Sequence, residues 1–80
     1  MKSFGSRDLI GCLLCLEFTE GKRRATSHVK YICPKKVEAG THPFITVILG
    51  RKTYDPVTRG RYITQLKILG YTTEEIESCM

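Results

Sequence analysis

The stretch of residues 26–33 constrains the fold more than any other part of the sequence, because its apolar and polar side chains alternate. Such alternation predicts a β-strand with one face buried and the other open to solvent. The apolar face of this strand carries Val29, Tyr31 and Cys33. His28 and Lys30 point to the opposite face. We therefore expect an imidazole and an ammonium group side by side on a sheet face outside the core.

The other predicted elements precede and follow this strand. Ser6 is suited to be the N-cap of a first helix, whose apolar face begins at Leu9 and continues for two to three turns. Residues 18–25 predict a poorly patterned first strand, and residues 35–43 a loop. Residues 44–49 are rich in β-branched side chains and predict the third strand, which ends at Gly50.

Capping signals define the last two helices. Asp55 and Pro56 are the residue types preferred at an N-cap and at the first helical position. Gly70 is the expected end of that helix. Residues 72–75 form a capping box, which predicts a short final helix from Thr73 to about Ser78.

The order of elements predicts an α+β fold in one domain, residues 1–80. It consists of a three-stranded antiparallel sheet with two helices on one face, a two-layer α-β-β-β-α arrangement, followed by the short C-terminal helix. The other sheet face is then open to solvent, and His28 is expected on it.

Positive charge is concentrated in the middle of the chain. Residues 22–67 contain eleven Lys and Arg against two acids, Glu38 and Asp55, which is a balance of +9 within a chain of net charge +5. Such a distribution favours a nucleic acid or another acidic partner, although an ordinary solvated surface also accounts for it. No apolar run is long enough to span a membrane, and no signal peptide is recognised at the start, so we expect a cytoplasmic protein with reduced thiols.

The four cysteines allow two interpretations. Cys12 and Cys15 form a C-x-x-C pair, which is typical of zinc or redox sites when a second pair follows closely. Cys33 and Cys79 stand alone in the sequence, and the first pair lies within an apolar helical pattern. Buried structural thiols are therefore the favoured interpretation, zinc is the alternative, and no metal or other cofactor is expected.

Residues 60–76 resemble the C-terminal signature of the HicA toxin family, with an Ile-Leu pair, a closing Gly70 and a short Glu-Glu turn. Residues 6–10 resemble the opening helix of that family. Residues 26–28 fall where the family carries Gly-Ser-His at the start of its second strand, with Thr26 in place of the glycine. The resemblance covers nearly the whole chain, in matching order and spacing.

Resemblance to this family implies a fold like that of double-stranded-RNA-binding domains. It also implies an endoribonuclease that cleaves mRNA and is neutralised by a HicB-like antitoxin, with His28 as the catalytic histidine. The cations and the serine near His28 are the candidate RNA contacts: Lys22, Arg23, Arg24, Ser27 and Lys30. A non-catalytic RNA-binding module of the same fold is the alternative.

Overall fold

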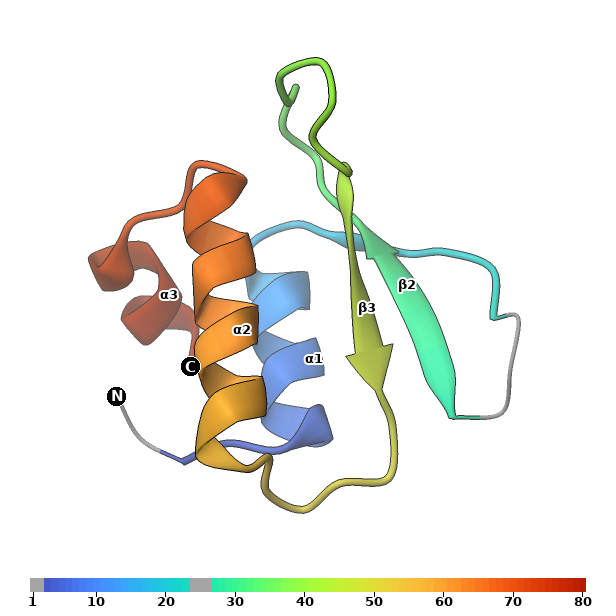
Figure 1. Cartoon of the computed structure of the whole chain (residues 1–80), viewed down its shortest axis with the longest axis vertical. Helices are drawn as coiled ribbons and strands as arrows, with labels where there is room; N and C mark the ends of the chain where they lie inside the picture. The colour runs from blue at the N-terminus through green and yellow to red at the C-terminus, as the bar shows by residue number, and fades with distance from the viewer. Residues whose placement is uncertain (1–2, 24–26) are drawn as a thin grey trace.

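Three helices and one antiparallel sheet make up the structure, a computed structural model that describes residues 3–23 and 27–80 (Figure 1). The elements are α1 (Ser6–Cys15), β1 (Thr19–Glu20), β2 (His28–Ile32), β3 (Phe44–Ile48), α2 (Pro56–Ile68) and α3 (Thr73–Cys79). The strands pair in the order β1-β2-β3. The predicted α+β class and its three-stranded antiparallel sheet are therefore confirmed.

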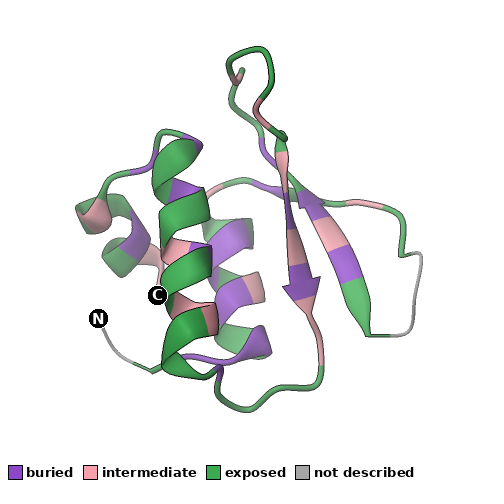
Figure 2. Cartoon of the chain, viewed as in Figure 1, coloured by how far each residue is buried: buried purple, intermediate pink, exposed green. Residues whose placement is uncertain are grey.

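One face of the sheet is buried, and the alternation of the strand residues decides which (Figure 2). Val29 pairs with Val47 and Tyr31 pairs with Ile45, and all four side chains are buried. They join a single apolar cluster whose fully buried helical members are Leu9, Cys12, Leu13, Leu66 and Ile76. The predicted inward face of residues 29–33 is confirmed.

Local capping produces the ends of α2 and α3 as predicted. The Asp55 carboxylate accepts hydrogen bonds from the Thr58 hydroxyl and from the amides of Val57 and Thr58 at the start of α2. These bonds, the Thr58 hydroxyl foremost, hold the pKa of Asp55 below its ordinary value of 3.8. Gly70, with φ +100°, follows the end of α2. Thr72 and Glu75 form the capping box of α3.

The start of α1 differs from the sequence prediction. Gly5, not Ser6, is the N-cap, and Ser6 is the buried first residue of the helix. The Ser6 hydroxyl donates to the Arg51 carbonyl oxygen at 3.0 Å and accepts from the Arg51 amide at 3.1 Å. The chain passes so close here that a Cβ at Gly5 would overlap the Lys52 carbonyl group. A long-range contact has therefore replaced the local cap that the sequence favours.

The first strand is much shorter than predicted. Of the described residues 18–23, Thr19 and Glu20 form β1. Phe18 turns into the core before the strand begins, and just beyond the strand the Gly21 amide donates to the Lys30 carbonyl oxygen at 2.7 Å. The prediction for the rest of this segment partly lies outside the described residues, because it includes positions 24 and 25.

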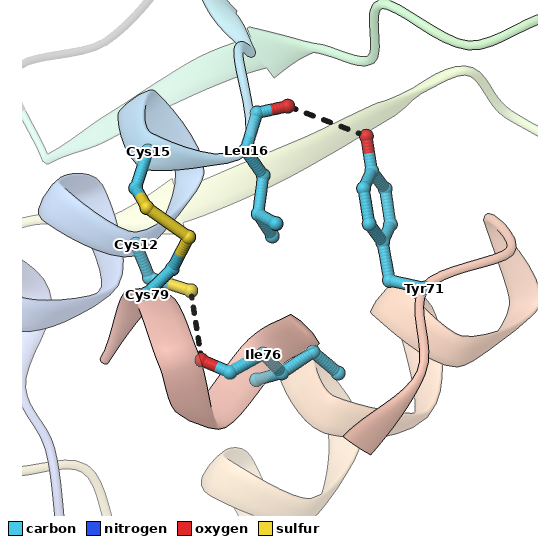
Figure 3. The surroundings of a disulfide bond; sticks show 6 residues. All are labelled: Cys12, Cys15, Leu16, Tyr71, Ile76 and Cys79. Atoms are coloured by element: carbon cyan, nitrogen blue, oxygen red, sulfur yellow. Dashed lines mark hydrogen bonds between the residues drawn. A yellow bond between two sulfur atoms is a disulfide. The ribbon is translucent and has the colours of Figure 1, made fainter. Parts of the chain in front are cut away.

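A disulfide bond between Cys15 and Cys79 contradicts the expectation that all thiols are reduced (Figure 3). Cys15 is exposed, so it is not the core thiol that the helical pattern predicted. The ends of α1 and α3 meet with a Cα–Cα distance of 5.6 Å, which is within the usual range for this bond. Cys12 and Cys33 are buried free thiols, as expected. Burial raises the pKa of Cys12, whose Sγ lies 3.8 Å from the Ile76 carbonyl oxygen.

Two tyrosine hydroxyls occupy part of the outer edge of β3. Even-numbered residues of β3 direct their backbone polar groups away from β2, because residues 43 and 49 make the ladder bonds to β2 at either end. Tyr62 of α2 accepts from the Ile48 amide at 3.0 Å and donates to the Thr46 carbonyl oxygen at 2.9 Å. Tyr54 donates to the Ile48 carbonyl oxygen at 2.6 Å. The two Tyr62 bonds fix α2 along the edge of the sheet (Figure 1).

Candidate functional site

His28 lies at the first position of β2, on the open face of the sheet, and its side chain is exposed. Alternation places it there, because Val29 and Tyr31 on either side of Lys30 turn into the core. The Nδ1 atom of His28 lies 3.0 Å from the Ser27 hydroxyl oxygen. This hydrogen bond engages one ring nitrogen and leaves Nε2 as the nitrogen that can meet a ligand.

Lys30 shares the open face with His28, as the sequence predicts, but its ammonium group points elsewhere. The Nζ atom lies over the ring of Phe44, 4.3 Å from the centroid. Phe44 pairs with Ile32 at the far end of β2, so the cation is directed away from the His28 end of the strand. The imidazole and the ammonium group therefore lie on the same face of the sheet but point toward different ends of β2.

The candidate cations Lys22 and Arg23 lie in the segment between β1 and β2. Lys22 and Arg23 are exposed and follow the last pairing of Gly21 with Lys30. Arg23 Nη2 lies 3.7 Å from the Glu20 carboxylate, and both side chains are 55% exposed. A solvated ion pair of this kind is weak, so it leaves the guanidinium available to a phosphate. Arg24, a further candidate, lies outside the described residues.

Tyr31 is excluded as a ring for base stacking. Only 4% of it is exposed, and burial raises the pKa of its hydroxyl, with the Glu20 carboxylate adding to the effect. This agrees with the core position that its place in the alternating strand predicted. The ring that the open face does present is Phe44, which sequence reasoning did not select. Alternation along residues 44–49 could have identified it, because the even-numbered side chains of this strand lie on the same face as His28 and Lys30.

The zinc alternative for the four cysteines is not supported. Two of them are joined in the disulfide bond. Within residues 3–23 and 27–80, no three His, Cys, Asp or Glu side chains gather in a way that could hold a metal ion. In the same part of the chain, no helix has the length and apolar character that crossing a membrane requires.

Comparison of the chain with protein-family models, with curated proteins and with solved structures finds no match.

Proposed function

We propose that this protein is an endoribonuclease of the HicA kind, the toxin of a type II toxin–antitoxin pair, and that it cleaves mRNA. The observation that carries the proposal is the setting of His28. Its imidazole is exposed at the start of β2, with Nδ1 held by Ser27 and Nε2 without a hydrogen bond to any residue that the structure describes. The order of residues that resembles the HicA family, with its double-stranded-RNA-binding-like fold, supports the same assignment.

The proposed reaction uses the nucleophile that RNA itself carries. The 2′-hydroxyl oxygen attacks the adjacent phosphorus, the bond from phosphorus to the 5′-oxygen breaks, and a 2′,3′-cyclic phosphate results. His28 Nε2 accepts the proton of the 2′-hydroxyl or donates one to the departing 5′-oxygen, and water exchanges the other proton. Because no external nucleophile has to be activated, the proposal includes no metal or other cofactor.

Ser27 is proposed as the residue that positions the imidazole. A hydroxyl can donate to or accept from Nδ1, so the same hydrogen bond survives when His28 changes its protonation state. The ring orientation is then maintained through a cycle of proton transfer. Loss of the Ser27 hydroxyl should weaken cleavage less than loss of His28, and the rate should be partly restored by threonine.

The candidate cations are proposed to bind RNA phosphates, and those that precede β2 to stabilise the charge that develops on the reacting phosphate. Lys22 and Arg23 precede β2, whereas Lys30 lies within β2 and directs its ammonium group toward Phe44. Loss of one such contact should weaken binding nearly equally for all RNA sequences. It should also flatten the salt dependence of the logarithm of the binding constant by about 0.7 for single-stranded RNA.

The partner is proposed to be an acidic HicB-like antitoxin that covers His28. It would neutralise the same cations that bind phosphate, so RNA and antitoxin should compete. Electrostatic complementarity of this kind also speeds association. If a saturating amount of antitoxin leaves RNA affinity and cleavage unchanged, the antitoxin does not act by covering this face.

The central test is cleavage of a defined mRNA by His28→Ala in the presence of a chelator. Removal of one proton-transfer group should slow cleavage by about 10²- to 10⁴-fold. A matched control is Glu74→Gln, an exposed change on α3, which lies across the molecule from β2 (Figure 1). Full activity of His28→Ala, or activity that requires a divalent ion, contradicts the mechanism.

The same experiment separates the alternative, a non-catalytic RNA-binding module. The observation that favours this alternative is that, among the described residues, Ser27 is the one side chain hydrogen-bonded to His28. No second acid or base therefore accompanies His28 there, and the ribonuclease reaction has to use water for the other proton transfer. A wild-type protein that binds RNA with a strong salt dependence and leaves it intact would favour this alternative.

A further inference from the structure

A hollow of about 430 Å³ lies between the start of β3, the loop before it and the C-terminal half of α2. Its apolar wall is formed by Phe44, Ile68 and Leu69. Ile68 is 65% exposed, so its side chain is open to a ligand in the hollow. The volume is within the range of sites that bind small organic groups, whose walls are mostly apolar with a few polar groups.

Polar groups in the hollow match the edge of a nucleobase. Gln65 supplies an amide with both donors and an acceptor, and Thr46 supplies a hydroxyl. The His42 ring also lines the hollow, with its centroid 5.5 Å from that of Phe44. Such mixed donors and acceptors around an aromatic wall suit a flat heterocycle with hydrogen-bonding groups on its rim.

Charge around the hollow favours an anionic ligand. None of the residues that line it carries a carboxylate. The Lys30 ammonium group lies 4.3 Å from the Phe44 centroid without lining the hollow, so it stands on another side of the same ring. A group that stacks on Phe44 therefore has a cation within reach for an attached phosphate.

We infer that this hollow binds one unpaired base of a single-stranded RNA, stacked on Phe44, with its rim read by Gln65 and Thr46. The inference rests on the proposed function and adds that the RNA segment bound here is single-stranded. Phe44 pairs with Ile32 and His28 pairs with Ile48, four positions apart along β3, which corresponds to about 13 Å. A base held at Phe44 would thus fix the position of the strand relative to His28, and hence the bond that is cleaved.

Fluorescence of a Phe44→Trp variant tests the inference directly, because the chain has no other tryptophan. The probe is a short 2′-O-methyl oligoribonucleotide, which lacks the 2′-hydroxyl and cannot be cleaved by the proposed route. Stacking of a base on the indole should quench its fluorescence. An abasic oligonucleotide of the same length, with the same phosphates, should bind through charge and leave the fluorescence unchanged.

Affinity measurements supply the second readout. Phe44→Leu keeps an apolar side chain of similar size and removes the π face, so it should weaken binding of the base-containing probe by about fivefold to a hundredfold. Binding of the abasic probe should not change. Val57→Ala, at a 65% exposed position of α2 outside the hollow, is the matched control and should change neither.

Gln65→Ala tests reading of the base without disturbing the core, because Gln65 is exposed. Affinity is measured for four 2′-O-methyl probes, each made of a single kind of base, and Gln65→Ala should reduce the difference in affinity among them. In the double variant Phe44→Trp, Gln65→Ala, the probes should still quench the tryptophan fluorescence. Equal affinity of wild type and Phe44→Leu for the base-containing probe overturns the inference. So does an effect of Phe44→Leu that is confined to binding of an acidic protein partner, which would assign the hollow to a protein side chain.

Base binding and cleavage are measured separately, so the two proposals can fail separately. Quenching with no cleavage by the wild type would support the base site and overturn the ribonuclease. Cleavage that depends on His28, with no quenching of Phe44→Trp and no effect of Phe44→Leu, would leave the ribonuclease intact and overturn the base site.

Discussion

Breaking the Cys15–Cys79 disulfide should lower the free energy of unfolding by about 4 kcal/mol while the native packing is retained. The bond joins residues 64 apart in sequence, so it closes nearly the whole chain into a loop. The helices that it links also touch without it. Ile76 of α3 is fully buried, and the Cys12 thiol of α1 contacts its carbonyl oxygen (Figure 3). The effect of reduction therefore falls mainly on the unfolded chain.

The magnitude follows from the loop length. For a loop of 64 residues, loss of chain entropy in the unfolded state is ~14 cal/mol/K, which corresponds to about 4.3 kcal/mol at 25 °C. Natural domains are stable by about 5–15 kcal/mol, and a domain of this size is expected near the lower end. The disulfide thus contributes a large fraction of the total, and the dithiol form should be only marginally folded.

Urea unfolding with and without a reductant measures this difference. The oxidised wild type should unfold at a midpoint roughly 2–4 M higher than the reduced protein. The double variant Cys15→Ser, Cys79→Ser is the control, because it should match the reduced wild type and show no response to the reductant. Thiol titration in denaturant should find only Cys12 and Cys33 free in the oxidised protein. Four free thiols, or coincident unfolding curves, would refute the reasoning.

Four smaller predictions concern single positions. Tyr62→Phe leaves the Ile48 amide without its partner and should lower the free energy of unfolding in urea by about 1–3 kcal/mol, whereas Tyr71→Phe removes a longer contact of 3.5 Å to the Leu16 carbonyl oxygen and should cost less. Gly5→Ala should destabilise by roughly 1–3 kcal/mol through its overlap with Lys52. Gly11→Ala, in the interior of α1, adds a Cβ that meets none of the described atoms within 4 Å outside its own stretch of helix, and should instead stabilise by about 0.5–1 kcal/mol. Because folding lowers the pKa of Asp55, its ionised carboxylate contributes fully to the free energy of unfolding above pH 3.8, and this contribution is lost as the pH falls through the pKa of the folded state. Asp55→Asn can still cap the helix, so the free energy of unfolding of this variant should depend less on pH in the acid range.

Sequence reasoning succeeded where the determining interactions are local. Asp55 with Pro56, and Thr72 with Glu75, satisfy backbone groups within one turn, so their spacing alone located the starts of α2 and α3. Alternation likewise assigned Val29 and Tyr31 to the core and His28 to the open face. Each of these signals lies within a few residues of the structure that it determines.

The predictions that failed depended on contacts distant in sequence. Ser6 has the chemistry of an N-cap, yet its hydroxyl is bonded to Arg51, 45 residues away. Cys15 fits an apolar helical pattern, but its partner lies beyond α2. The direction of Lys30 is set by Phe44 on the neighbouring strand, which no pattern within β2 encodes. Local periodicity predicts on which face of a helix or strand a side chain lies, but it does not identify the distant residue that the side chain contacts.

The tyrosine hydroxyls along β3 also restrict how this protein can join another chain. An added strand would need the Thr46 carbonyl oxygen and both polar groups of Ile48, which Tyr62 and Tyr54 already occupy. The sheet is therefore closed to β-augmentation over this part of β3. A protein partner that binds here must recognise side chains on the open face, so its specificity should depend on residue identity more than on backbone pairing. The same closure protects this part of the β3 edge against edge-to-edge aggregation while the molecule is free.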